Sequence, residues 1–434
     1  MTHHSKRTAQ ALLALALAGA TTNPAYAAEV ATPWVATWTA SPQPVWGNEF
    51  LFPTNVPATL HDQTFRQVAR IGLGGPRVRL VFSNTYGPKP LPLGVVTVAL
   101  SEGEDRVVVG SVHQVTFDGK STATIASGAP LVSDPIPLQV PALAKLTISV
   151  HVPGETPVTT FHWDGRQTAW IVPGDQTAAP RLDTAQATTT TARLLLSGIE
   201  VEAGNSIGTV AVIGDSITDG ATASLDSNSR WPDFLATRLA PHRASVINAG
   251  ISGGRLLSDG MGVNALARLD RDVLAQPGVR TIVVLLGIND ISWPGTTFAP
   301  QARRPTLDDL AAGYRQLVAR ARSRGMRVVG ATLTPFEGAL PGTPLADYYH
   351  ADKDALRRQL NDWIRTSGTF DAVLDFDVLM RDRGHPARFD PRFDSGDHLH
   401  PGDEGNRAMA ESVDLELLLP GITARGAVAT SQAH

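Results

Sequence analysis

The stretch that decides the fold is residues 209–220 (TVAVIGDSITDG), in which an apolar run passes directly into a polar turn flanked by glycines. A short, apolar, β-branched run such as 209–214 is typical of a strand that is buried on both faces. Ser216 follows this run, so we expect its hydroxyl at the carboxyl edge of a sheet, where parallel α/β sheets bind ligands. Taken alone, the serine is also typical of an ordinary turn or helix N-cap.

After residue 205 the chain repeats a pattern of strand, loop and helix. The clearest helical pattern is 307–324, with Thr306 and Asp309 at the spacing of a capping box and Gly325 at its end. Apolar strands that alternate with helices predict a parallel sheet covered on both faces. The predicted strands are 209–214, 245–249, 281–286, 327–333 and 372–376.

Before residue 205 the chain shows alternation with a period of two instead. In 77–83 (RVRLVFS) and 145–152 (KLTISVHV) every second residue is apolar, and Pro/Gly pairs separate such runs. This pattern predicts an antiparallel β-sandwich or jelly-roll-like domain. We therefore expect an N-terminal β-domain over residues 28–205, an α/β domain over 206–420 and a C-terminal tail over 421–434.

The first 27 residues have the pattern of a signal peptide. Lys6 and Arg7 precede a short apolar run at 11–20, and Ala25-Tyr26-Ala27 matches a small-x-small cleavage site. The apolar run is about half of the ~20 residues that a membrane-spanning helix needs. We expect cleavage near Ala27 and a secreted or periplasmic protein without a membrane anchor.

The composition excludes several classes of protein. The 434 residues carry a net charge of −4, which argues against nucleic acid as a partner. The chain has no cysteine, which excludes disulfides, thiolate metal sites and a cysteine nucleophile.

Two further predicted strands end in groups that suit a developing oxyanion. Residues 248–254 (NAGISGG) follow the second strand, and 287–290 (GIND) follow the third. Glycine allows an unobstructed backbone N–H, and asparagine supplies a side-chain amide donor. Each segment alone is an ordinary loop, but three strand ends that supply a nucleophile and donors indicate a catalytic site.

A candidate general base lies near the C-terminus in residues 397–401 (DHLHP). Asp397 can reach His400 three residues later and orient its imidazole, as a serine nucleophile requires. His398 is a competing base that the spacing does not exclude. A metal site at Asp397, His398 and His400 is a further alternative, but no additional ligand is evident.

Together these segments resemble the four blocks of the SGNH, or GDSL-type, hydrolases, in the same order and over about residues 207–418. Ile217 stands where the family name has leucine. Residues 230–235 (RWPDFL) and 37–42 (TWTASP) are similar to a secreted subgroup with an N-terminal β-domain. Members of that subgroup are often carbohydrate or acyl esterases.

The resemblance implies a flavodoxin-like parallel sheet and a role for each matching residue. Ser216 would be the nucleophile, His400 rather than His398 the general base, and Asp397 the carboxylate that orients it. The oxyanion hole would combine the N–H groups of Ser216 and Gly253 with the Asn289 side chain. The implied reaction is hydrolysis of short acyl esters, with carbohydrate acetyl groups as one candidate, through an acyl-enzyme and without a metal or cofactor. The implied partner is a small-molecule or polysaccharide ester.

Three alternatives remain open at this point. Residues 250–254 (GISGG) match the G-x-S-x-G nucleophile elbow, which would make Ser252 the nucleophile, although its glycines make a poor helix start. The protein could instead act on lipids as a lipase or phospholipase, or bind polysaccharide without catalysis. Trp293 and Phe336 follow two strands and are candidates for substrate binding or for core packing.

Overall fold

The centre of the C-terminal region is strand β18 (Gly208–Gly214), which is buried along its whole length. The computed structural model describes residues 32–47 and 50–422, so the predicted signal peptide and most of the predicted tail lie outside the described residues. Strand β18 has parallel neighbours on both sides, which explains why its sequence is apolar at nearly every position.

The parallel sheet has five strands in the order β19-β18-β20-β21-β22. This is the flavodoxin-like order, and it confirms the predicted fold class. The other strands of this sheet are β19 (Ala244–Gly250), β20 (Val279–Leu285), β21 (Arg327–Ala331) and β22 (Ala372–Leu374).

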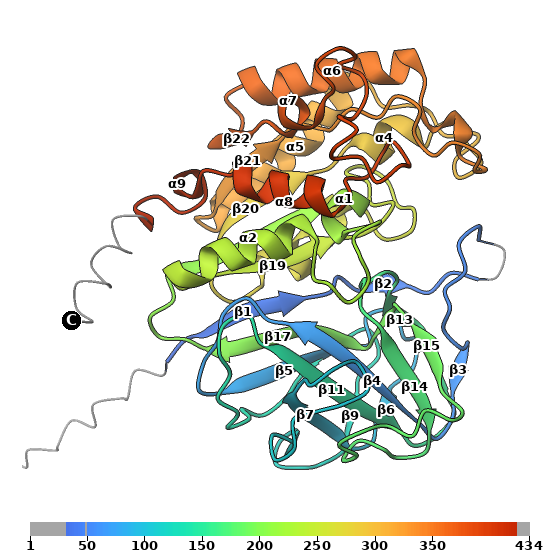
Figure 1. The fold of residues 1–434 in the computed structure, drawn as a ribbon, viewed down its shortest axis with the longest axis vertical. Helices are drawn as coiled ribbons and strands as arrows, with labels where there is room; N and C mark the ends of the chain where they lie inside the picture. Colours follow the sequence, from blue (N-terminus) through green and yellow to red (C-terminus); the bar gives the residue numbers. More distant parts are fainter. Residues whose placement is uncertain (1–31, 48–49, 423–434) are drawn as a thin grey trace, which may run out of the picture. The chain divides into compact units, whose positions relative to one another are not determined.

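The helices of this region form two groups. Helix α2 (Trp231–Leu239) packs against α8 (Asp403–Ser412) (Figure 1). Helix α5 (Leu307–Ser323) instead contacts α3 (Ala265–Leu269) and α6 (Ala351–Thr366). The chain leaves β18 toward one edge of the sheet and β20 toward the other. Right-handed crossovers therefore place α2 and α5 on opposite faces.

Helix α5 begins and ends as its sequence predicts. The Thr306 hydroxyl accepts a hydrogen bond from the Asp309 N–H, and the Asp309 carboxylate accepts one from the Thr306 N–H. Gly325 follows the helix with a φ of +71°. These reciprocal contacts satisfy N–H groups that would otherwise have no partner.

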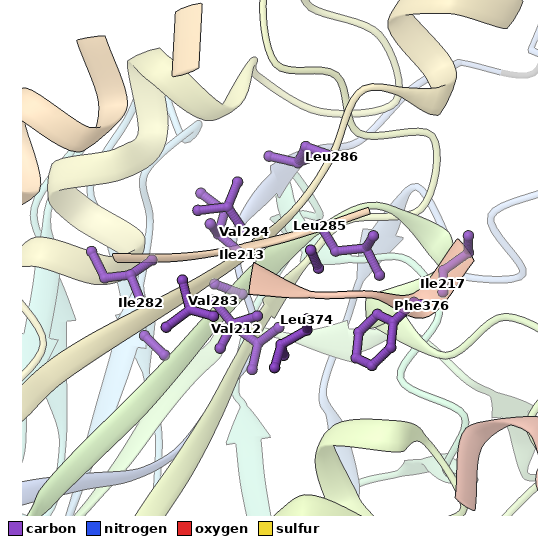
Figure 2. Packing of buried hydrophobic residues seen from close by; sticks show 14 of the residues in the cluster. Val212, Ile213, Ile217, Ile282, Val283, Val284, Leu285, Leu286, Leu374 and Phe376 are labelled. Atoms are coloured by element: carbon purple, nitrogen blue, oxygen red, sulfur yellow. The ribbon is translucent and has the colours of Figure 1, made fainter. Parts of the chain in front are cut away.

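A single apolar cluster fills the space between the sheet and its helices. Figure 2 shows side chains of β18 and β20 packed together with Leu374 and Phe376. The short helices α7 (Phe376–Met380) and α9 (Leu415–Leu418) complete this cluster through Phe376, Met380 and Leu418.

The N-terminal region is antiparallel and β-rich, as predicted. Its two larger sheets contribute to one shared apolar cluster, so they form a sandwich. One sheet contains β1 (Trp34–Thr39), β17 (Leu196–Glu202), β5 (Val78–Ser83) and β10 (Pro130–Val132). The other contains β15 (Thr188–Thr190), β14 (Ala169–Pro173), β4 (Gln63–Arg70), β11 (Lys145–Val152), β7 (Val96–Leu100) and β8 (His113–Gln114).

Three smaller antiparallel sheets accompany the sandwich. One of them places β13 (Thr160–His162) between β16 (Arg193–Leu194) and β2 (Gln43–Pro44). The others pair β3 (Thr59–Leu60) with β12 (Thr156–Pro157) and β6 (Leu91–Leu93) with β9 (Ala123–Ile125).

The two regions are in direct contact, and the described residues from Pro33 onward form one compact unit. Strand β1 lies against β19, and the Thr209 hydroxyl donates a hydrogen bond to the Ala36 carbonyl at 3.0 Å. The predicted domain boundary near residue 205 falls between β17 and β18 and stays a prediction. Within residues 32–47 and 50–422, no helix combines the length and apolar character needed to cross a bilayer.

Candidate active site

The carboxyl ends of three neighbouring strands lie level with one another. Gly214 at the end of β18 is paired with Gly250 of β19 and with Leu285 of β20. The turns that follow these strands therefore emerge side by side. They carry Ser216, Gly253 and Asn289, so the structure brings together the segments that the sequence predicts to form the site.

Ser216 is the first residue of the single-turn helix α1 (Ser216–Asp219). The Asp215 carboxylate caps this helix by accepting a hydrogen bond from the Ile217 N–H at 3.0 Å. Gly220, with a φ of +102°, ends it. The tight turn holds Ser216 at the edge of the sheet with 9% of its surface exposed.

The imidazole of His400 connects Ser216 to Asp397. Its Nε2 lies 2.7 Å from the Ser216 Oγ, and its Nδ1 lies 2.6 Å from the Asp397 Oδ2. The other carboxylate oxygen of Asp397 accepts a hydrogen bond from the backbone N–H of His400 at 2.8 Å. Burial alone would raise the pKa of Asp397, but these contacts with His400 outweigh it and hold the pKa below its ordinary value.

His398 lies outside this arrangement. Its Nδ1 is paired with the Asp394 carboxylate, and nearly half of its side chain is exposed. It has a φ of +60°, and the turn at this position directs the chain so that His400 alone contacts Ser216. Among the described residues, no group of three or more histidine, cysteine or acidic side chains is arranged to hold a metal ion.

Gly253 occupies a position that only glycine fits. Its φ is +71°, and a Cβ atom there would lie 2.6 Å from the Met261 sulfur and 2.8 Å from the Trp293 ring. Within the described residues, the backbone N–H groups of Ser216 and Gly253 have no acceptor. Both are therefore available to a ligand oxygen.

The Asn289 side chain is held in one orientation by two partners. Its Nδ2 donates a hydrogen bond to the Gly254 carbonyl at 3.0 Å, and its Oδ1 accepts one from the Tyr348 hydroxyl at 2.7 Å. Because an amide nitrogen carries two hydrogens, one donor remains for a ligand. Asn289 is the second residue of α4 (Ile288–Ser292), the short helix that follows β20.

Tyr348 was not identified from the sequence. It lies 59 residues from Asn289, in a segment without a recognisable motif. Its side chain is fully buried, and burial raises the pKa of its hydroxyl well above the ordinary value. The hydroxyl therefore stays protonated and donates to Asn289.

Arg268 is a second residue that sequence patterns did not reveal. Its buried guanidinium donates hydrogen bonds to the carbonyls of Ala249 at 2.7 Å and Gly214 at 3.2 Å. The Asp272 carboxylate lies 3.0 Å from this guanidinium and neutralises its charge. Arg268 thus ties together the ends of β18 and β19, next to Ser216. The sequence pattern that accompanies Arg268 is an acidic residue four positions later, Asp272, and such a pair is common on any helix.

The environment of Ser252 differs from that of a nucleophile. Its hydroxyl donates a hydrogen bond to the Asp219 Oδ2 at 2.8 Å, and the structure assigns it no contact with a histidine among the described residues. The next helix, α3, starts only at Ala265, whereas a nucleophile elbow needs a helix directly after the serine.

Trp293 and Phe336 are both buried, with 3% and 0% of their surface exposed. Trp293 stacks on Phe298 at a centroid distance of 4.6 Å, and Phe336 packs edge-on against Tyr348 and Tyr349. Neither ring presents a free face, so their observed role is core packing rather than direct stacking on a substrate.

The parallel sheet and its helices have the flavodoxin-like arrangement. Residues 212–408 match the GDSL-like Lipase/Acylhydrolase family, whose members are generally hydrolases. No curated protein matches the chain.

Solved structures with similar folds include two bacterial proteins. One is a GDSL-like lipase from Bacteroides thetaiotaomicron, with 19% identity, a TM-score of 0.37, and coverage of 49% of this chain and 88% of that chain. The other is a carbohydrate acetylesterase from Sinorhizobium meliloti, with 17% identity, a TM-score of 0.36, and coverage of 51% of this chain and 99% of that chain.

Proposed function

We propose that the protein is a serine esterase that hydrolyses short-chain acyl esters through an acyl-enzyme. The observation that carries this proposal is the continuous contact from Ser216 through His400 to Asp397, at 2.7 Å and 2.6 Å. A base within hydrogen-bond distance of a hydroxyl, itself oriented by a carboxylate, is the arrangement that activates a serine.

The first half of the reaction transfers the acyl group to the enzyme. His400 Nε2 takes the proton of Ser216 as its Oγ attacks the ester carbonyl carbon, and Asp397 stabilises the imidazolium. The carbonyl oxygen becomes an oxyanion and receives hydrogen bonds from the N–H groups of Ser216 and Gly253 and from Asn289 Nδ2. Each well-placed donor lowers the barrier by roughly 3 kcal/mol.

The second half returns the enzyme to its starting state. The intermediate collapses, the bond to the alcohol oxygen breaks, and His400 gives its proton to the departing alcohol. Water then attacks the acyl-enzyme with His400 again as the base. The carboxylic acid leaves and the Ser216 hydroxyl is restored.

The surroundings of Gly253 support a short acyl group. The Trp293 ring and Met261 fill the space next to Gly253, which leaves little room for a long chain in that direction. Acetyl groups on carbohydrates are one such substrate. The N-terminal sequence pattern supports export, with cleavage near Ala27.

Labelling with a serine-reactive fluorophosphonate, followed by peptide mapping, tests the nucleophile. We expect modification at Ser216. Modification at Ser252 would favour the rival elbow, and no labelling together with no activity would favour a non-catalytic binding protein. Hydrolysis rates across p-nitrophenyl esters of increasing chain length, alongside acetylated xylan, test the substrate. A preference for long chains would indicate a lipase instead.

A further inference from the structure

A histidine of the N-terminal region reaches into the segment that carries Ser216. His162 is the last residue of β13, and 5% of its surface is exposed. Its Nε2 lies 2.8 Å from the Asp219 Oδ1, and its Nδ1 lies 3.1 Å from the Ser41 carbonyl oxygen. Asp219 is the last residue of α1, three positions after Ser216.

Both neighbours of the His162 ring are hydrogen-bond acceptors. A neutral imidazole has one N–H, so donation to both acceptors requires the doubly protonated, cationic ring. Burial by itself lowers the pKa of His162, but the Asp219 carboxylate and the hydrogen bonds outweigh it and raise the pKa above its ordinary value. His162 and Asp219 therefore form a buried ion pair between the two regions of the chain.

The second oxygen of Asp219 holds the segment next to Gly253. Asp219 Oδ2 accepts hydrogen bonds from both the N–H and the hydroxyl of Ser252, each at 2.8 Å. Ser252 directly precedes Gly253, whose N–H is free for a ligand oxygen. His162 is thus two hydrogen-bonded links away from a proposed oxyanion donor.

These contacts leave the turn little freedom. A Cβ atom on Gly250 would lie 2.4 Å from the Asp219 N, so the end of β19 packs directly on α1. Without His162, Asp219 would be a buried carboxylate that has lost its facing cation. Such a group is strongly unfavourable and tends to rearrange toward water or another cation. Any such movement would pull on Ser252 and displace the Gly253 N–H.

We propose that His162 is a positioning residue through which the N-terminal β region fixes the Gly253 N–H for the oxyanion. The proposal rests on the proposed esterase function. It gives Asp219 and Ser252 a role in orienting the hole, and it makes the N-terminal region part of the catalytic apparatus. His162 itself does not touch the substrate.

The test compares His162→Gln with His151→Gln in the full chain. His151 is also in the N-terminal region, but it pairs with Asp62 and contacts no residue of the site. We expect His162→Gln to lower kcat on p-nitrophenyl acetate by roughly 10²-fold, as for loss of one oxyanion donor, with KM changed by less than about 3-fold. His151→Gln should keep wild-type kinetics.

A second readout separates positioning from general damage to the fold. A trifluoromethyl ketone forms a tetrahedral adduct with the serine, so its oxygen occupies the hole. Its affinity should fall in parallel with kcat in His162→Gln, whereas circular dichroism should stay unchanged. Folded His162→Gln with a kcat near that of wild type would overturn the proposal.

Asp219→Asn decides the matter if His162→Gln fails to fold. This isosteric change removes the negative charge, and we expect the same selective loss of kcat and of ketone affinity. An unchanged kcat in folded Asp219→Asn would reject the proposal. Failure of the esterase function looks different, because the wild type would then have no activity or Ser216→Ala would keep it.

Discussion

The Nε2 atom of His400 lies 2.7 Å from the Oγ atom of Ser216, although the two residues are 184 positions apart in the sequence. The contact joins the first turn of the parallel sheet to the loop before α8. Because the loop is held by a hydrogen bond from the Leu340 N–H to the Asp397 carbonyl at 2.8 Å, the proposed base is oriented before a ligand arrives. Preorganisation of this kind is what catalysis by the pair requires.

Ser216→Ala should leave a folded protein whose esterase activity falls by at least ~10³-fold. The hydroxyl contributes chemistry and little packing, since it lies at the edge of the sheet. Steady-state rates and a thermal melt measure the two effects separately. Ser252→Ala tests the rival nucleophile, and retained activity in Ser216→Ala with complete loss in Ser252→Ala would transfer the role to Ser252.

His400→Ala should reduce turnover nearly as much as Ser216→Ala, and the double variant should be little worse, because the two side chains work as a unit. His398→Ala should cost much less, since its imidazole faces Asp394 instead of Ser216. Kinetics of the three variants test this directly. A larger loss in His398→Ala than in His400→Ala would contradict the assigned base.

Asn289→Ala should lower kcat by roughly 10²–10³-fold with little change in KM, because its donor matters most when the oxyanion has formed. Tyr348→Phe removes only the hydroxyl that orients Asn289, so we expect a smaller loss with the same signature. If both variants instead lost thermal stability while the folded fraction kept its kcat, Asn289 would be a structural residue only.

Burial raises the pKa of Asp215 to about 7 and that of Asp290 to about 6. An unfolded aspartate titrates near pH 3.9, so the folded state binds more protons between about pH 4 and pH 7. The free energy of unfolding should therefore fall as the pH rises through this window, by up to ~1.4 kcal/mol per pH unit for each group.

Asp215→Asn keeps the capping oxygen of α1 but removes one of these titrations. Urea unfolding at several pH values from 4.5 to 7 should show a shallower slope than in wild type, because the titration of Asp215 no longer contributes to it. Asp309→Asn, at the exposed cap of α5, is the matched control and should leave the slope in this window unchanged. An unaltered slope in Asp215→Asn would contradict the raised pKa.

Arg268→Met should destabilise the protein by about 3–5 kcal/mol, because it leaves the buried Asp272 with one cation fewer and frees two carbonyls at the strand ends. Arg303→Met removes an exposed ion pair with Asp309 and should change stability by less than about 1 kcal/mol. The urea concentrations at the unfolding midpoints of the two variants measure and compare these losses of stability. Equal midpoints would show that Arg268 does not hold the strand ends together.

Local patterns in the sequence were enough to predict the main elements. The alternation in 145–152 corresponds to β11, and the capping box at Thr306 corresponds to the start of α5. The apolar run before Ser216 corresponds to β18. These elements could be predicted because each depends on residues within one or two turns of the chain, where side-chain periodicity and capping act directly.

Contacts between distant residues were decided only by the tertiary structure. His398 and His400 are two positions apart, and spacing alone could not choose between them; the backbone turn at His398 does. Sequence patterns likewise did not indicate the contact of Tyr348 with Asn289 or of His162 with Asp219. Such contacts depend on how the sheet, its loops and the N-terminal region pack, and no local periodicity encodes that packing.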